Sequence, residues 1–173
     1  ELLDVHVVTT LMNRGGFPDD HPLALGMPGM HGNYTAVTAI QESDLLITLG
    51  ARFDDRVTGK VDAFAPDAKV IHADIDPAEF NKVRSADVSI QGDVGQTITE
   101  LIKALKELSG TRDHPDRSAW KSQISGWKER FPLVYDEWQQ GEGLKPQYVI
   151  EQLRDNTPDD TIVASGAVSY THL

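Results

Sequence analysis

LLITLGARFDDRVTGK, residues 45–60, joins an apolar run to a polar loop and sets the expected fold class of the chain. Residues 44–49 are apolar apart from Asp44 and Thr48. They have the length and composition of a strand buried on both faces of a parallel sheet. The polar loop therefore begins where a strand ends. In open α/β sheets, the loops at the carboxyl ends of the strands form the crevice that binds ligands.

The loop after this strand carries two arginines and two aspartates. Arg52 and Arg56 flank Asp54 and Asp55, and the loop opens with Gly50. Glycine lets a backbone approach a ligand closely. An arginine fork offers paired donors to a diphosphate or a carboxylate and stays charged. We therefore predict a local anion site here. The alternative is a surface loop whose arginines and aspartates pair with one another.

Composition limits the possible partners of the chain. The formal net charge is -11 over 173 residues, which argues against nucleic acid or an anionic membrane as the main partner. The sequence has no cysteine, so disulfides, thiolate metal sites and a cysteine nucleophile are excluded. No apolar run approaches the roughly 18 residues of a membrane span. The first residues do not resemble a targeting leader, so we expect a cytoplasmic protein.

Strand and helix patterns alternate from His6 to Leu108. Such alternation predicts an α/β fold, a parallel sheet with helices on both faces. Val37 and Ile40, one turn apart, support the first helix, and apolar residues three and four apart up to Leu108 support the second. The expected strands are 6–10, 44–49, 69–75 and 88–90, and the expected helices are 34–41 and 94–108.

A long loop, residues 11–29, follows the first expected strand. It exceeds the usual connection length, so we carry a binding or lid role as a hypothesis. Its end, residues 26–32, places glycines before a helix, where backbone N–H groups favour an anion. The same glycines could instead shape a turn. His31 alone is more often a packed or solvated residue than a ligand.

Acidic residues stand at the ends of the next two expected strands. An acid at this position in a nucleotide-binding sheet commonly accepts hydrogen bonds from ribose hydroxyls, and Asp74 is the candidate. Asp76, which precedes Pro77, fits the cap of a short helix better. Asp93 has the same alternative, because a helix pattern begins directly after it.

After residue 108 the sequence predicts a domain boundary, then a helix, and then the start of a further domain. Residues 109–117 are polar and rich in turn formers. Residues 119–140 hold all three tryptophans, and tryptophans seven apart predict a helix face that packs against another domain or subunit. A helix from Pro146 to Leu153 and a strand at 161–165 are expected next. We interpret them as the opening of a further domain.

Four motifs in order carry a resemblance to a known family. They are PGMHG at 28–32, GARFDDRVTG at 50–59, HADIDP at 72–77 and GD at 92–93. With them the chain closely resembles the acetolactate synthases, also called acetohydroxyacid synthases, which depend on thiamine diphosphate. The resemblance implies a central, Rossmann-like FAD-binding domain at 1–108, a linker at 109–143, and the start of the thiamine-diphosphate-binding domain at 144–166. Residues 167–173 depart from the family and resemble a translated adapter, so we expect a non-native tail.

The resemblance also implies site residues. The flavin and its diphosphate would be held mainly by loops, and the adenosine ribose would lie near the ends of the later strands. Arg56 would recognise the second 2-oxo acid, Met30 would face the same channel, and Asp55 would orient Arg56 by a hydrogen bond. The implied FAD-binding residues are Thr10, Leu11, Met12, Gly29, Met30, His31, Gly32, Gly50, Ala51, Arg52, Asp54, Arg56, Val57, Asp74, Ile75, Asp93 and Val94.

The implied reaction joins two pyruvates, or pyruvate and 2-oxobutyrate, with loss of carbon dioxide in branched-chain amino acid biosynthesis. Thiamine diphosphate and Mg²⁺ would be needed at sites mostly outside this sequence, so the fragment alone is expected to be inactive. A homo-oligomer, dimer or tetramer, and a possible regulatory small subunit are also implied. The alternatives are a sister thiamine-diphosphate carboligase or decarboxylase, or a stand-alone nucleotide-binding module.

Overall fold

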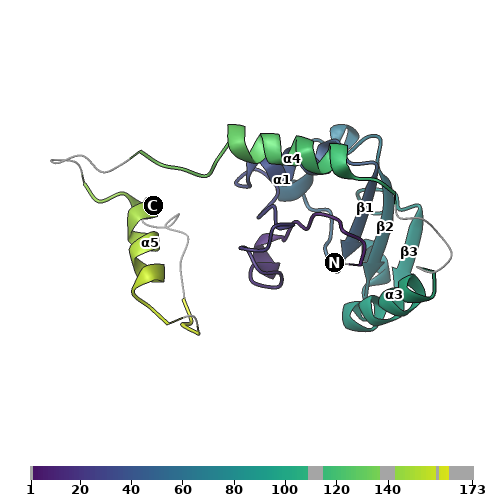
Figure 1. Ribbon diagram of the computed structural model, residues 1–173. Helices are drawn as coiled ribbons and strands as arrows, with labels where there is room; N and C mark the ends of the chain where they lie inside the picture. The colour runs from purple at the N-terminus through teal and green to yellow at the C-terminus, as the bar shows by residue number, and fades with distance from the viewer. Residues whose placement is uncertain (1, 109–114, 137–142, 159, 164–173) are drawn as a thin grey trace, which may run out of the picture. The chain divides into compact units, whose positions relative to one another are not determined.

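The computed structural model describes residues 2–108, 115–136, 143–158 and 160–163. The chain divides into two compact units, residues 1–132 and residues 133–173, and each is treated by itself below. The first unit holds three strands and most of the helices (Figure 1). The second holds one described helix. The assignment of these parts to a FAD domain, a linker and a thiamine-diphosphate domain stays a prediction.

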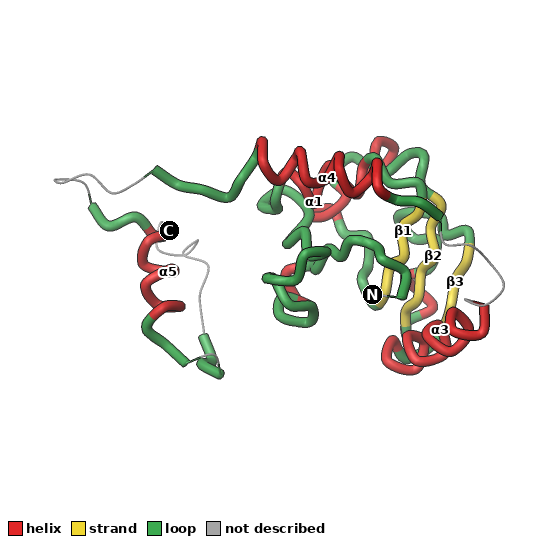
Figure 2. The backbone as a smooth tube through the Cα atoms, viewed as in Figure 1, coloured by secondary structure: helices red, strands yellow, loops and turns green. Residues whose placement is uncertain are grey.

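A parallel three-stranded sheet forms the centre of the first unit (Figure 2). The strands are β1 (Leu45–Leu49), β2 (Lys69–Asp74) and β3 (Val88–Gln91), in the order β1-β2-β3. Leu49 of β1 lies opposite Ala73, and Asp74 of β2 lies opposite Gln91 of β3. Helical segments follow each strand. The predicted α/β fold with a parallel sheet is thus confirmed.

The burial of β1 differs from the prediction. β2 is the central strand and its side chains are mostly buried, whereas β1 is an outer strand of the described sheet. Leu45 is 45% exposed, and Leu49 at the other end is also exposed. Composition indicated a strand buried on both faces, but a strand pattern cannot reveal whether a neighbouring strand covers its outer edge.

The strand expected at residues 6–10 does not form. Val7 makes a single parallel bridge to Ala24, in which the Val7 N–H donates to Leu23 O and Val7 O accepts from the Leu25 N–H. The β-branched composition of this segment favours extended backbone, and extended backbone is what forms. Its partner is an irregular loop, so the ladder ends after one bridge.

The main core lies between β2, the loop after β1, and α1 (Tyr34–Gln41). Ile40 of α1 packs with Val70 of β2, and two phenylalanines from the connecting loops fill the remaining space. The Gln41 side chain accepts a hydrogen bond from the Ala65 N–H at 2.8 Å, which ties the end of α1 to this core. The core residues are Ile40, Phe53, Phe64, Ala65, Ala68 and Val70.

The caps predicted from the acidic residues are confirmed. Asp76 accepts from the Ala78 N–H at 2.9 Å and begins a short 3-10 turn, η3 (Pro77–Glu79). Asp93 accepts from the Gln96 N–H at 3.0 Å and precedes α3 (Val94–Leu108). Side-chain oxygens at these positions satisfy backbone donors that the first turn leaves free.

The tryptophan helix, which lies in the predicted linker, packs on a helix of the unit that holds the sheet. The predicted contact with another domain or subunit stays a prediction. This helix, α4 (Ser118–Arg130), contacts α1 (Figure 1). Ile124 is buried against Ala36 and Ala39, while Trp120 and Trp127 meet edge to face at 5.7 Å between ring centres. The predicted stripe is real, but its partner is a neighbouring helix. Trp138 lies outside the described residues.

In the second unit, the predicted helix is confirmed as α5 (Pro146–Asp155). The Tyr135 hydroxyl donates to the Glu151 carboxylate of this helix. The strand expected at 161–165 is absent from its described part, residues 161–163, which are irregular. Residues 164–165 and the tail expected at 167–173 lie outside the described residues.

Candidate functional site

The carboxyl ends of the three strands meet at one edge of the sheet. The Gly50 N–H donates to Ala73 O at 2.8 Å, and the Gly92 N–H donates to Asp74 O at 3.0 Å. These hydrogen bonds extend the pairing of the strands by one residue. The loops that follow the three strands therefore begin next to one another. The structure therefore brings together the predicted residues that follow the strands, which are Gly50, Ala51, Asp74, Ile75, Asp93 and Val94.

Gly50 is needed for the close approach of two of these loops. Its φ is +62°, a conformation that side chains with a Cβ rarely adopt. A Cβ at this position would lie 2.9 Å from Cγ2 of Val94, at the start of α3. The first and third strand ends thus pack closely because residue 50 is a glycine. A substitution there would push the loop away from α3.

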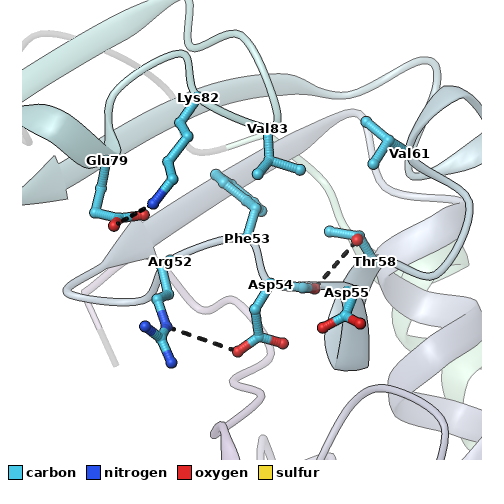
Figure 3. A pocket seen from close by; sticks show the side chains of 9 residues that line it. All are labelled: Arg52, Phe53, Asp54, Asp55, Thr58, Val61, Glu79, Lys82 and Val83. Carbon is cyan, nitrogen blue, oxygen red and sulfur yellow. Dashed lines mark hydrogen bonds and ion pairs between the residues drawn. The ribbon is translucent and has the colours of Figure 1, made fainter.

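The loop after β1 is held by one buried side chain and one cap. Phe53 points into the core and fixes the loop, whereas Arg52 on one side of it is exposed (Figure 3). Asp54 accepts from the Arg56 N–H at 3.0 Å and begins the short helix α2 (Asp55–Thr58). Its other oxygen lies 3.8 Å from Nε of Arg52. The alternative interpretation, in which arginines and aspartates of the loop pair with one another, is thus met by this one pair at a long distance.

The hydrogen bond expected between the side chains of Asp55 and Arg56 is not present among the described residues. Both side chains are exposed, and they follow each other at the start of α2. Consecutive residues on a helix do not face each other, which explains the difference. Asp54, through the Arg56 backbone N–H, fixes the arginine's position instead.

A second predicted loop docks on the backbone of Arg56. The Met30 N–H donates to Arg56 O at 3.1 Å. Gly29, with φ +93°, faces the same carbonyl, and a Cβ there would lie 2.2 Å from the oxygen. The Met30 side chain is 70% exposed. The structure thus joins two segments, distant in sequence, that were each singled out by their own motif, and it leaves Met30 and Arg56 accessible beside each other.

Other predicted residues lie farther along these loops. Leu11 and Met12 belong to the 3-10 turn η1 (Leu11–Asn13), and Met12 is 94% exposed. No hydrogen bond between described residues links Thr10, Leu11 or Met12 to the loops at the strand ends. His31 is exposed at the end of the glycine-rich segment, and Gly32 packs against Met27 O. The roles assigned to these residues stay predictions.

A cavity of about 320 Å³ opens beside the loop after β1 (Figure 3). Its second wall, which comes from the end of η3 and the residues after it, was not identified from the sequence. There Lys82 and Glu79 pair at 2.9 Å. These charges are three residues apart in a stretch without helix or strand periodicity, so no pattern marked them. The lining residues are Arg52, Phe53, Asp54, Asp55, Thr58, Val61, Glu79, Lys82 and Val83.

Asp74 turns largely inward at the end of β2. Its side chain is 12% exposed. One oxygen accepts from the Asp76 N–H at 2.9 Å, and the other lies 3.9 Å from Nε2 of the buried His72. The carboxylate predicted to bind a ribose therefore exposes only a small part of its surface. Ile75, the next residue, is exposed at the same edge.

No group of three or more His, Cys, Asp or Glu residues in the described part of the chain could hold a metal ion. Within the same residues, every helix is too short or too polar to cross a membrane.

Comparison with known proteins gives one family and a set of close relatives. Residues 1–101 match the family described as "Thiamine pyrophosphate enzyme, central domain". The chain is 54% identical over 168 residues to "Acetolactate synthase" of Mycobacterium bovis, with 96% of this chain and 26% of the relative covered. It is 51% identical over 166 residues to "Acetolactate synthase large subunit" of Corynebacterium glutamicum, with 96% and 26% covered.

A plant protein is similar over the same region. "Acetolactate synthase 1, chloroplastic" of Oryza sativa subsp. japonica is 46% identical over 166 residues, with 96% of this chain and 25% of the relative covered. The chain thus spans about a quarter of the length of the curated relatives it matches.

Proposed function

The chain belongs to the thiamine pyrophosphate enzymes, whose central domain it contains, and on this premise we propose that it is part of an acetolactate synthase catalytic subunit. The observation that carries the proposal is the 54% identity over 96% of the chain to a protein of that name. The proposed reaction condenses two pyruvates, or pyruvate and 2-oxobutyrate, with loss of carbon dioxide. Sister carboligases and decarboxylases are less favoured, because the relatives from bacteria and a plant share one name.

We further propose that the strand-end edge holds FAD. The fit is supported by the close packing of the predicted loops: Gly50 lets the loop after β1 approach α3, and Gly29 lets the glycine-rich segment lie against the backbone of Arg56. The exposed Arg52 guanidinium suits the diphosphate, since it offers paired donors and a permanent charge. In the glycine-rich segment, the N–H groups of Met30 and Gly32 already donate within the protein, whereas those of Gly29 and His31 have no partner among the described residues and would add donors. The exposed Ile75 would lie against the nucleoside, next to the Asp74 carboxylate.

We assign the acceptor 2-oxo acid to Arg56. Its side chain is exposed, and within the described residues no hydrogen bond or ion pair engages its guanidinium. A guanidinium with no partner among the described residues suits the carboxylate of a small substrate. Met30, whose backbone N–H bonds to Arg56 O, adds an exposed apolar side chain from the adjoining loop. Arg56 would bind and orient the carboxylate, and Met30 would contact the alkyl group.

When bound, thiamine diphosphate would supply the carbanion chemistry that forms the new carbon–carbon bond. The resemblance places the residues that hold it, and the Mg²⁺ motif, mostly outside this sequence. The role of this chain is then to bind FAD and to position the second substrate. A homo-oligomer, a regulatory small subunit and a cytoplasmic location stay predictions that accompany this proposal.

The test of the Arg56 assignment is a comparison of Arg56→Ala with Lys60→Ala in the complete catalytic chain. Lys60 is an exposed cation just beyond the same short helix, so it controls for lost charge. We expect Arg56→Ala to raise KM for the acceptor about tenfold or more, because a hydrogen-bonded charge pair is lost. FAD affinity should change little, since Met30 and Gly29 contact the backbone of residue 56. Equal losses of FAD affinity and acceptor use would contradict the assignment.

A further inference from the structure

His72, in the middle of β2, is completely buried, and both of its ring nitrogens, Nδ1 and Nε2, lack a hydrogen-bond partner among the described residues. An unpaired polar atom in the core costs stability, whereas an aliphatic or phenyl side chain would fill the same space without that cost. Packing alone therefore does not explain a histidine at this position.

Two phenylalanines from different loops hold the imidazole ring. Phe53 meets it at 5.2 Å between ring centres with an interplanar angle of 73°, and Phe80 meets it at 5.2 Å with an angle of 83°. Both contacts are edge to face, a preferred arrangement of aromatic rings. Phe53 comes from the loop that carries Arg52, and Phe80 follows η3. The ring is thus fixed in place by the two segments that also line the cavity.

The fixed ring directs one nitrogen at Asp74. Residues 72 and 74 are two apart on a strand, so their side chains leave the same face of the sheet. Nε2 of His72 lies 3.9 Å from Oδ2 of Asp74, while Oδ1 already accepts from the Asp76 N–H. This distance is too long for a hydrogen bond, and a small rotation of the carboxylate would shorten it.

We propose that His72 is the positioning residue for Asp74. In this arrangement the imidazole presents an Nε2–H donor to the carboxylate. The carboxylate would then be held between this donor and the Asp76 amide, which would leave its remaining lone pairs to accept hydrogen bonds from hydroxyls of the dinucleotide. Because so little of the Asp74 side chain reaches the surface, its orientation decides whether a hydroxyl is bound. The proposal rests on the proposed FAD site and extends it.

Three substitutions of His72 separate positioning from packing. His72→Gln places an amide N–H near the position of Nε2, His72→Asn places one near Nδ1, and His72→Phe keeps an aromatic ring without any N–H. FAD affinity is measured by flavin fluorescence in the complete catalytic chain, with circular dichroism as the check of folding. We expect the Gln variant to bind FAD within about twofold of wild type, and the other two to bind about tenfold more weakly. If the Asn variant does not fold, the Phe variant supplies the comparison.

A double-mutant cycle with Asp74→Ala completes the test. If His72 acts through Asp74, His72→Phe should cause no further loss of FAD affinity in the Asp74→Ala background. A Gln variant as weak as Phe, or full additivity in the cycle, would overturn the proposal. Asp74→Ala with wild-type FAD affinity would instead overturn the nucleotide assignment of Asp74 in the proposed function. Failure of the His72 proposal and failure of the Asp74 assignment would therefore give different results.

Discussion

Gly29→Ala is the most informative perturbation of the contact between the two loops. Gly29 has φ +93°, and an alanine Cβ would lie 2.2 Å from Arg56 O. Ordinary contact begins at 3.4 Å, so the loop must move away from this carbonyl. That movement breaks the 3.1 Å bond from the Met30 N–H to Arg56 O. The loop would then leave the short helix that carries Arg56.

The expected loss in the free energy of unfolding of Gly29→Ala has two parts. The left-handed backbone costs about 1 to 2 kcal/mol for a residue with a Cβ. The broken hydrogen bond costs about 1 kcal/mol more. Gly15→Ala is the matched control, since Gly15 has φ +86° but nothing within 4 Å of the added Cβ. It should therefore cost only the backbone part.

The assay measures FAD affinity and thermal midpoint in the complete catalytic chain. We expect Gly29→Ala to lower the midpoint more than Gly15→Ala and to weaken FAD binding about tenfold, as a loss near 1.4 kcal/mol gives. Gly15→Ala should leave FAD affinity within about twofold, because it moves no loop contact. If both variants had the same effect on FAD affinity, the contact with Arg56 would have no part in the site, and the reasoning would be refuted.

Three further predictions concern other parts of the chain. Lys128→Met removes two hydrogen bonds, to Pro22 O at 3.1 Å and Ala24 O at 3.0 Å, and should lower the free energy of unfolding by about 1 kcal/mol. Lys121→Met, which breaks only a surface ion pair with Asp4, should cost less in the same denaturation assay, and the reverse order would be contradictory. Burial, then Lys128 and Lys121, lower the pKa of His6 below 6.5. His6 therefore binds a proton more readily in the unfolded chain than in the folded one. The free energy of unfolding should be highest above pH 6.5 and should fall as the pH drops below that value. His6→Gln should flatten this dependence in thermal midpoints, and an unchanged slope would exclude His6 as its source. The hydrogen bond to Glu151 raises the pKa of Tyr135 to about 12, so ultraviolet titration should show a late phenol that Tyr135→Phe removes. Glu151→Gln should return it toward 10.0, and a late phenol that persists would contradict the assignment.

The central sheet and its loops were predictable from the sequence because their patterns are local. An apolar run ending in Gly50 marks β1, and an acid before a helix pattern marks Asp93 as a cap. Parallel strands bring such ends together at one edge, so the grouping of the predicted residues followed from the fold class.

The features that the sequence did not predict share a physical cause. Each depends on which other segment packs against it, and the local sequence does not specify that partner. Residues 6–10 have strand composition but meet a loop, so they form one bridge at Val7. The stripe of Trp120 and Trp127 was predicted as a packing face, but its sequence could not specify that α1 is the helix it packs on. Lys82 and Glu79 have no periodic signal, and the cavity they line depends on how two loops fold back.

The docking of the Gly29 segment on Arg56 was predictable in part. The glycine and the arginine were each singled out by their own motif. Their contact required a left-handed glycine facing a carbonyl far along the chain, which no spacing rule contains.

The most direct test of the account is an FAD titration of the complete catalytic chain, followed by flavin fluorescence. It compares wild type with Arg52→Ala, at the carboxyl edge of the sheet, and with Lys69→Ala, at the opposite end of β2. We predict saturable binding that Arg52→Ala weakens about tenfold and that Lys69→Ala leaves unchanged. Equal effects of the two substitutions, or no FAD binding by the folded protein, would contradict the assignment of the dinucleotide to the strand-end edge.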